Sequence, residues 1–143
     1  MSEVVSKLSV LLADTYALYL KTQNYHWHVT GPNFSALHEL FETQYTELAD
    51  AIDEIAERIR VLNAKAPATF TELQNLKTLQ DGDADKDACD MVKDLEMDNM
   101  SLVESLNELL DIASEARDEG TVGFVSERIG VHEKASWMLR SSA

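Results

Sequence analysis

Two pairs of side chains have the residue types and the spacing of metal ligands. His38 is followed four residues later by Glu42. Asp53 and Glu57 repeat this spacing further along the chain. Side chains four residues apart lie on one face of a helix, so each pair can hold a metal ion. Imidazole and carboxylate ligands together suit iron, manganese or zinc rather than thiophilic metals. Such pairs also occur as solvated or salt-bridged side chains on acidic helices, and spacing alone leaves both interpretations open.

The two pairs cannot meet within one chain. Their midpoints are fifteen residues apart, about 22 Å along a helix, yet the net turn between them is only about 60°. A second copy of the helix, antiparallel about a two-fold axis, would bring the His–Glu pair of one chain against the Asp–Glu pair of its partner. His26, on the preceding helix, can complete such a site. The spacing therefore predicts a metal site built from two subunits and present twice in each dimer.

The other histidines, and the tryptophan beside His26, have different predicted roles. His28 lies about 200° around the helix from His26, so we expect it at a surface or an interface. His132 is expected to be a buried histidine with hydrogen-bond partners. For Trp27 two interpretations stay open: packing, or a role beside the metal in limiting access or donating an electron. No histidine has Glu three residues before it, so we expect no metal centre inside a single helix bundle.

Helical spacing of apolar residues extends over nearly the whole chain. It is clearest in a predicted helix of about 29 residues, with one stripe formed by Phe34, Leu37, Phe41, Tyr45, Leu48, Ile52, Ile55, Ile59 and Leu62. Asn33 is its predicted N-cap. A first helix is predicted from about Glu3 to Val29, with a face formed by Val5, Leu8, Leu12, Tyr16, Tyr19 and Gln23 and leading to His26. A third is predicted from about Lys86 to Arg117, and a fourth follows a stop and a new N-cap at Gly120-Thr121. No segment alternates strictly enough for a convincing strand.

Four amphipathic helices in one short chain predict an all-α fold, a helix bundle. The first two helices are joined by a few residues, as are the last two, so each pair is expected to be antiparallel. More than twenty residues, about Asn63 to Asp85, separate the second and third helices, and Thr71 to Leu79 within them is predicted to be a short helix. One long crossover is the ferritin-like connectivity. We therefore expect a single ferritin-like domain over residues 1–143.

Composition narrows the possible partners. The chain has 143 residues, 26 acidic and 12 basic, which gives a formal charge of −14. Such a chain repels nucleic acid and anionic membranes and attracts cations. A single cysteine, Cys89, excludes an intramolecular disulfide. Without a signal peptide or a long apolar segment, the chain is expected to be cytoplasmic, with no membrane partner.

Eight acidic residues and two lysines lie between Asp81 and Asp98. We interpret this acidic run as a helix N-terminus, favoured by negative charge, together with a solvated face. A surface that gathers cations is the alternative.

Four stretches of the sequence carry a family likeness. They are NYHWHVTGPNF at 24–34, LHELFE at 37–42, IDEIAERI at 52–59 and HEKASWMLRS at 132–141. In order and spacing they resemble the Dps family (DNA protection during starvation), the ferritin-like mini-ferritins. The likeness covers essentially the whole chain.

This resemblance implies a homododecameric shell of four-helix subunits, built from two-fold dimers. It also implies that Fe(II) is oxidised at ferroxidase sites across the two-fold interface, with hydrogen peroxide as the preferred oxidant and dioxygen as the alternative. Ferric mineral would be stored inside the shell. By match to the family's motif, the iron ligands would be His26, His38 and Glu42 of one subunit with Asp53 and Glu57 of its mate. Trp27 matches the family's tryptophan beside this centre.

The sequence departs from DNA-binding members of the family. Those members usually carry a flexible extension rich in Lys and Arg, whereas only Lys7 precedes Asp14 here, and the sequence ends soon after Arg140. With a charge of −14 in each subunit, phosphate contacts would be few and sensitive to salt. We therefore expect no direct DNA binding, and leave nucleoid association open. The alternative functions are a nucleoid protein that compacts DNA and a structural or zinc-inhibited cage without oxidation chemistry.

Overall fold

The computed structural model describes residues 2–143 and consists of five helices. They are α1 (Glu3–His28), α2 (Phe34–Val61), α3 (Phe70–Leu76), α4 (Ala88–Glu115) and α5 (Glu119–Arg140). No strand occurs within residues 2–143, so the predicted all-α class is confirmed. None of the described helices is both long and apolar enough to cross a membrane.

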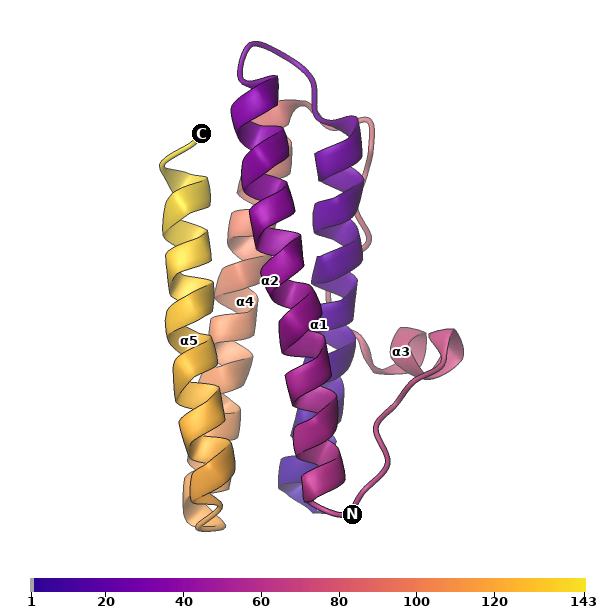
Figure 1. Cartoon of the computed structure of the whole chain (residues 1–143), viewed down its shortest axis with the longest axis vertical. Coiled ribbons are helices and arrows are strands. Elements are labelled where there is room, and N and C mark those ends of the chain that lie inside the picture. Colours follow the sequence, from indigo (N-terminus) through magenta and orange to yellow (C-terminus); the bar gives the residue numbers. More distant parts are fainter. Residues whose placement is uncertain (1) are drawn as a thin grey trace.

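The four long helices lie side by side, and the short α3 lies outside the bundle next to α1 (Figure 1). α1 and α2 form one antiparallel pair, and α4 and α5 form the other. The segment between α2 and α4 runs back along the length of the bundle, so that these two helices point in the same direction (Figure 1). This single long crossover is the predicted ferritin-like connectivity.

Most of the predicted apolar stripe on α2 lies in the core. Leu37, Phe41, Leu48, Ile55 and Ile59 are buried, whereas Phe34 at the start of the helix is 41 % exposed. The stripe packs against apolar side chains of α1 and α4, and together they form one continuous buried core along the bundle. Burial of this stripe, at about 25 cal/mol per Å² of apolar surface, is the main force that places α2 beside α1.

The face predicted on α1 is buried over its first half but not over its second. Tyr16 is 39 % exposed and Tyr19 is half-buried, whereas Leu11, Leu18 and Tyr25 are buried. α1 packs against both α2 and α4, so its buried surface turns toward the middle of the bundle. Tyr16 and Tyr19 lie instead at the edge of the bundle, where Tyr19 meets a ring of α2.

Two helix starts show how local hydrogen bonds set the boundaries. Asn33 occupies the predicted N-cap position of α2, but its side chain makes no capping hydrogen bond. Thr121 is not the N-cap of α5: Asp118 is, and its carboxylate accepts hydrogen bonds from the Thr121 N–H (3.2 Å) and hydroxyl (2.6 Å). An aspartate is at least as good a cap as threonine, so α5 begins earlier than predicted. Gly31, between α1 and α2, has φ +116°, a conformation that favours glycine.

The short helix in the crossover is Phe70–Leu76 rather than the predicted Thr71–Leu79. Thr69 caps its start by accepting a hydrogen bond from the N–H of Glu72 (3.1 Å). The helix ends early because the buried Asp14 of α1 takes the next backbone donors. Its Oδ1 accepts from the N–H groups of Thr78 (2.6 Å) and Leu79 (3.1 Å).

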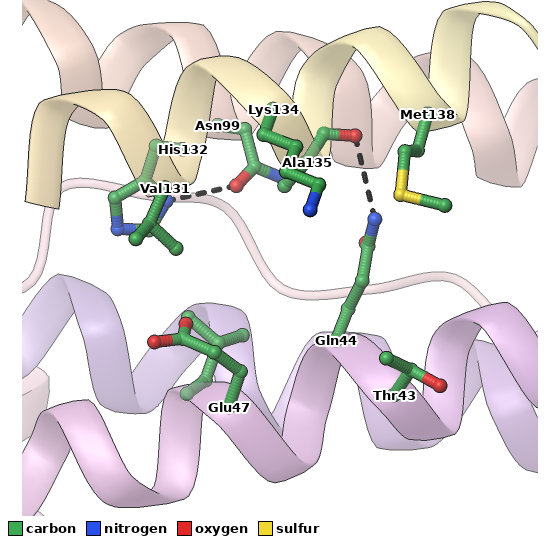
Figure 2. Close-up of a pocket in the computed structure, with 10 residues that line it drawn as sticks. Thr43, Gln44, Glu47, Asn99, Val131, His132, Lys134, Ala135 and Met138 are labelled. Atoms are coloured by element: carbon green, nitrogen blue, oxygen red, sulfur yellow. Dashed lines mark hydrogen bonds between the residues drawn. The ribbon is translucent and has the colours of Figure 1, made fainter.

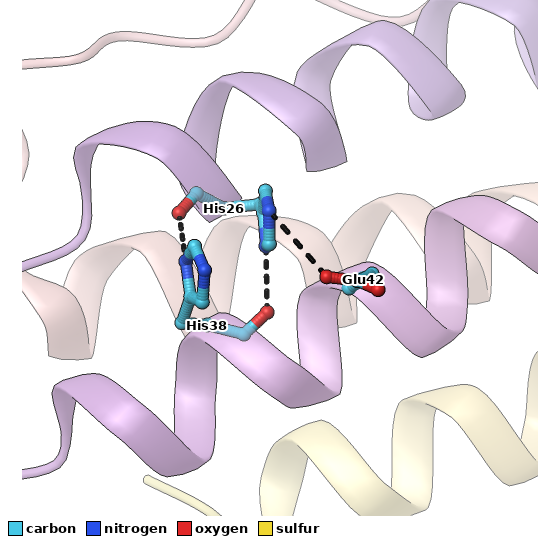
Figure 3. A group of neighbouring side chains, drawn as sticks. All are labelled: His26, His38 and Glu42. Atoms are coloured by element: carbon cyan, nitrogen blue, oxygen red, sulfur yellow. Dashed lines mark hydrogen bonds and ion pairs between the residues drawn. The ribbon is translucent and has the colours of Figure 1, made fainter.

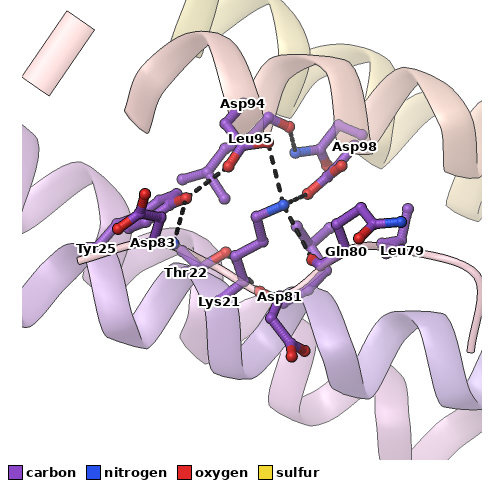
Figure 4. A network of polar contacts seen from close by, with 12 residues as sticks. Lys21, Thr22, Tyr25, Leu79, Gln80, Asp81, Asp83, Asp94, Leu95 and Asp98 are labelled. Atoms are coloured by element: carbon purple, nitrogen blue, oxygen red, sulfur yellow. Dashed lines mark hydrogen bonds and ion pairs between the residues drawn. The ribbon is translucent and has the colours of Figure 1, made fainter. Parts of the chain in front are cut away.

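Further along, a buried lysine of α1 holds the crossover and α4 together (Figure 4). Lys21 Nζ donates to the carbonyl of Gln80 and to Asp94 Oδ1, each at 3.1 Å, and lies 2.8 Å from Asp98 Oδ2. The interpretation of the acidic run as wholly solvated is therefore wrong for Asp94 and Asp98, which point into the bundle. The other part of that interpretation, a helix N-terminus favoured by negative charge, is confirmed for Asp87, which caps α4 by accepting from the N–H of Asp90 (2.8 Å).

Tyr25 extends the same network. Its hydroxyl donates to Asp94 Oδ2 (2.5 Å) and accepts from the N–H of Asp83 (3.1 Å). Burial, together with the bond to Asp94, raises the pKa of Tyr25 well above its ordinary value. Three polar side chains of α1, those of Asp14, Lys21 and Tyr25, thus fix the returning segment and leave the neighbouring face of the helix free for other contacts.

Candidate metal centre

The short turn between α1 and α2 brings two histidines together. His26 lies in the last turn of α1, and His38 lies in the second turn of α2. Because the two helices are antiparallel and joined by residues 29–33 alone, the end of one faces the beginning of the other (Figure 3). The sequence predicted His26 as a partner of the His–Glu pair, and the structure places it there.

The two histidines hold each other by reciprocal hydrogen bonds. His26 Nδ1 donates to the backbone carbonyl of His38 (2.6 Å), and His38 Nδ1 donates to the carbonyl of His26 (2.7 Å). The rings are stacked, with centroids 3.7 Å apart and planes at 13°. A carbonyl oxygen can only accept, so the hydrogen of each neutral ring is on Nδ1 and the lone pair is on Nε2. A backbone carbonyl bonded in this way is the usual partner that orients a metal-binding histidine.

Glu42 completes a group of three potential ligands. Its Oε1 lies 3.8 Å from His26 Nε2, and one ligand atom from each of the three residues lies within 4.8 Å of the others. Within residues 2–143, this is the one group of three or more such side chains that could hold an ion. We refer to His26, His38 and Glu42 as the His–Glu cluster. His26 is only 6 % exposed, His38 is half-buried and Glu42 is exposed, so the cluster is closed at His26 and open at the carboxylate.

Asp53 and Glu57 are not part of the His–Glu cluster. Both side chains are exposed further along α2, as the sequence predicted for a pair that cannot reach the first pair within one chain. Their assignment as ligands from a second subunit stays a prediction.

Two aromatic rings frame the cluster. Tyr45 meets the His26 ring edge-on, with centroids 5.2 Å apart and planes at 73°. Phe34 stacks on His38 at 5.0 Å and 26°. The sequence placed Tyr45 in the apolar stripe and missed its place at the site; its position seven residues after His38 was the available signal. Trp27 is 60 % exposed and has no ring contact within the described residues.

The other two histidines lie outside the cluster. His28 is exposed, and its Nδ1 bonds to the carbonyl (2.8 Å) and side-chain oxygen (2.9 Å) of Asn24. His132 is buried: its Nδ1 donates to Asn99 Oδ1 (2.9 Å), and its Nε2 accepts from Arg128 Nη2 (3.0 Å). Burial, with a smaller contribution from Arg128, lowers the pKa of His132 to about 3. The prediction of a buried, hydrogen-bonded histidine is confirmed.

A pocket between α2 and α5 lies beside His132 (Figure 2). Gln44 spans it by donating to the carbonyl of Ala135 (3.3 Å), and Glu47 is held by two bonds from Arg128. Both ring nitrogens of His132 already have partners, and the carboxylate of Glu47 is paired. The pocket therefore offers no free set of metal ligands, and the His–Glu cluster stays the best candidate.

Comparison with known proteins agrees with this architecture. The family model described as "Ferritin-like domain" matches residues 5–142. "DNA protection during starvation protein 2" of Bacillus anthracis is 37% identical over 142 residues, which are 97% of this chain and 95% of that protein.

Two solved structures are similar to this chain in both fold and sequence. A Dps protein from Bacillus brevis has a TM-score of 0.94 at 35% identity, with 96% of this chain and 93% of that chain covered. A Dps protein from Vibrio cholerae O1, described as a member of a superfamily of ferritin-like diiron-carboxylate proteins, has a TM-score of 0.93 at 32% identity, with 97% and 87% covered. The chain belongs to the Dps family of ferritin-like proteins.

Proposed function

We propose that this protein oxidises Fe(II) with hydrogen peroxide at ferroxidase sites shared by two subunits and stores the ferric product. Family membership supports iron storage and protection against oxidative stress. The observation that carries the finer proposal is the His–Glu cluster, in which each Nδ1 is bonded to a carbonyl and each Nε2 is left for an ion. Preorganised imidazoles with an open carboxylate suit an ion that enters, reacts and leaves.

The charge of one chain's cluster is too small for ferric iron. Two neutral imidazoles and the Glu42 carboxylate supply a single negative charge. Asp53 and Glu57 of the partner subunit would add two more, and the resulting set of nitrogen and oxygen ligands suits iron. The carboxylates would stabilise the trivalent product, while the imidazoles fix the position of the ion.

The overall reaction balances with two iron ions for each peroxide. Hydrogen peroxide, two Fe(II) and two protons give two Fe(III) and two water molecules. Each iron loses one electron, and the O–O bond accepts both. Because peroxide receives two electrons, no hydroxyl radical is released.

Assembly and partners follow from the same proposal. An antiparallel dimer through α2 would form two complete sites, and a homododecamer of such dimers would enclose the mineral. The charge of −14 on each chain draws Fe(II) toward the shell. It also disfavours phosphate contacts, so direct DNA binding is not expected. We place the protein in the cytoplasm and leave nucleoid association open.

Substitution of one proposed ligand tests the function. Fe(II) is added without oxygen at two ions per subunit, peroxide follows, and ferric absorbance is recorded by stopped flow. We expect rapid oxidation by the unmodified protein and its loss in Glu57→Ala. Glu54→Ala is the matched control, because Glu54 is an exposed acid on the same helix outside both pairs. Oxidation no faster than in buffer, or equal rates in the two variants, would contradict the proposal.

A further inference from the structure

A row of tyrosines leads away from the His–Glu cluster. We propose that Tyr45, Tyr19 and Tyr16 form an electron relay that supplies the second electron to peroxide when a single Fe(II) occupies the site. This inference rests on the proposed function, because it takes Fe(II) and hydrogen peroxide as the reactants.

Each ring of the row meets the next edge to face. Tyr45 lies 5.2 Å from His26, Tyr19 lies 5.9 Å from Tyr45, and Tyr16 lies 6.0 Å from Tyr19, all between ring centroids. The interplanar angles are 73°, 78° and 85°. These are the distances and angles of favourable aromatic pairs. Rings in contact give an electron a continuous path from a metal ligand to Tyr16, which is 39 % exposed.

The relay uses the face of α1 that does not enter the core. Tyr16, Tyr19 and His26 follow one another along this face, and Tyr45 reaches from α2 between the last two. Gln23 Nε2 donates to the hydroxyl of Tyr19 (3.1 Å), which fixes that ring. The tyrosines of this face, which the core does not bury, are thus available for electron transfer to the site.

The relay would supply the second electron that peroxide needs when only one Fe(II) is bound. A single Fe(II) supplies one electron, and reduction of peroxide by one electron leaves a hydroxyl radical. With a tyrosine as the second donor, one peroxide, one Fe(II), one tyrosine and one proton give Fe(III), a tyrosyl radical and two water molecules. The phenolic O–H bond breaks: its electron goes to the O–O bond, and its proton is consumed in forming water.

The tyrosine is restored by the next iron. A tyrosyl radical, one Fe(II) and one proton give tyrosine and Fe(III), so the sum of both steps is again two Fe(II) for each peroxide. The relay thus stores the oxidising equivalent until a second Fe(II) arrives. The oxidising equivalent would rest on Tyr16, the most exposed ring of the row at 39 %, where a proton can be exchanged with water.

The fourth tyrosine provides a natural control. Tyr25 is the neighbour of His26 in sequence, but it is buried, donates to Asp94 (2.5 Å) and has no ring contact with the row. Burial raises its pKa, so loss of its proton is unfavourable. Trp27, which the sequence suggested as an electron donor, has no ring contact with the cluster within the described residues.

Freeze-quench electron paramagnetic resonance tests the relay. The assembled protein is loaded without oxygen with one Fe(II) for each site, mixed with one equivalent of peroxide and frozen at successive times. We expect a tyrosyl signal in the unmodified protein and in Tyr25→Phe, and its loss in Tyr45→Phe. Tyr19→Phe should also lose the signal of the exposed tyrosine, and both relay variants should still oxidise iron when two Fe(II) are supplied for each site.

Ferric absorbance measured on the same samples separates the two proposals. Ferric iron without a tyrosyl signal in the unmodified protein, or an undiminished signal in both Tyr45→Phe and Tyr19→Phe, would overturn the relay and leave the ferroxidase standing. Absence of ferric iron under both loading conditions would overturn the proposed function, and the relay with it.

Discussion

At the scale of single residues, the histidines of this chain differ in role because their ring nitrogens have different partners. His26 and His38 each give Nδ1 to a backbone carbonyl, and Nε2 is left for a metal. His132 uses both nitrogens within the protein, through Asn99 and Arg128. The same side chain is therefore a candidate ligand in the first case and a structural link between α4 and α5 in the second.

The buried His132 makes stability depend on pH. Its pKa is lowered from 6.5 to about 3, so the unfolded chain takes up a proton at pH values where the fold does not. The contribution of the neutral, buried His132 to the free energy of unfolding is therefore fully present above about pH 6.5, and it is lost as the pH falls from there toward 3. Urea unfolding at pH 7 and pH 5 should show a smaller loss for His132→Gln than for the unmodified protein. The exposed His28→Gln serves as the control and should retain the full loss; equal losses in the two variants would refute this assignment.

At the scale of elements, α1 organises the molecule through different faces. One face holds the crossover with Asp14, Lys21 and Tyr25, and another carries Tyr19 and His26 toward α2. The crossover is long and mostly polar, so it has little apolar surface of its own to fix its path. Buried polar contacts from a rigid helix take over that role.

Among these side chains, Lys21 is the one whose loss should destabilise the fold most. Lys21→Met would leave the buried carboxylate of Asp98 without its cation, while the half-buried Asp94 would keep only Lys86 (3.3 Å). Removal of one partner of a buried pair costs about 3–5 kcal/mol. We expect a fall of that size in the free energy of unfolding, measured with urea. Lys7→Met is the control, since its contact with Glu108 (3.8 Å) lies at the surface and should be worth no more than about 1 kcal/mol.

Removal of the unpaired charge should reverse part of the loss. The double variant Lys21→Met/Asp98→Asn keeps the shape of the second side chain but not its charge, so it should be more stable than Lys21→Met alone. Equal stability of Lys21→Met and Lys7→Met would mean that the buried network contributes little to the fold.

Sequence periodicity predicted the elements better than the contacts between them. The stripe on α2 and the crossover follow from local spacing, because burial of one face repeats every three to four residues. Asp94 and Asp98 looked like solvated acids, since nothing near them in sequence indicates that Lys21 is their partner. Tyr45 looked like a core residue for the same reason: its neighbours His26 and Tyr19 come from another helix. The burial of α1 could not be predicted from its own spacing, because the sequence does not tell which helices lie on either side.

At the scale of the whole molecule, the proposed site needs ligands from two chains. The His–Glu cluster provides ligands on one half of α2, and the exposed Asp53 and Glu57 lie on the other half. A two-fold axis across α2 would make these halves complementary, and two-fold dimers form self-complementary contacts of this kind. Function would then depend on assembly, and a monomer with an intact fold would lack the activity.

Mixing of two inactive variants tests this central claim most directly. His38→Ala and Asp53→Ala subunits are unfolded together, refolded in equal amounts, and assayed for Fe(II) oxidation by peroxide. If each site draws ligands from two chains and subunits pair at random, half of the dimers are mixed and each restores one site of two. Activity should then return to about a quarter of that of the unmodified protein. Intact assemblies with no more activity than either variant alone would show that the two residues do not serve one site from opposite subunits.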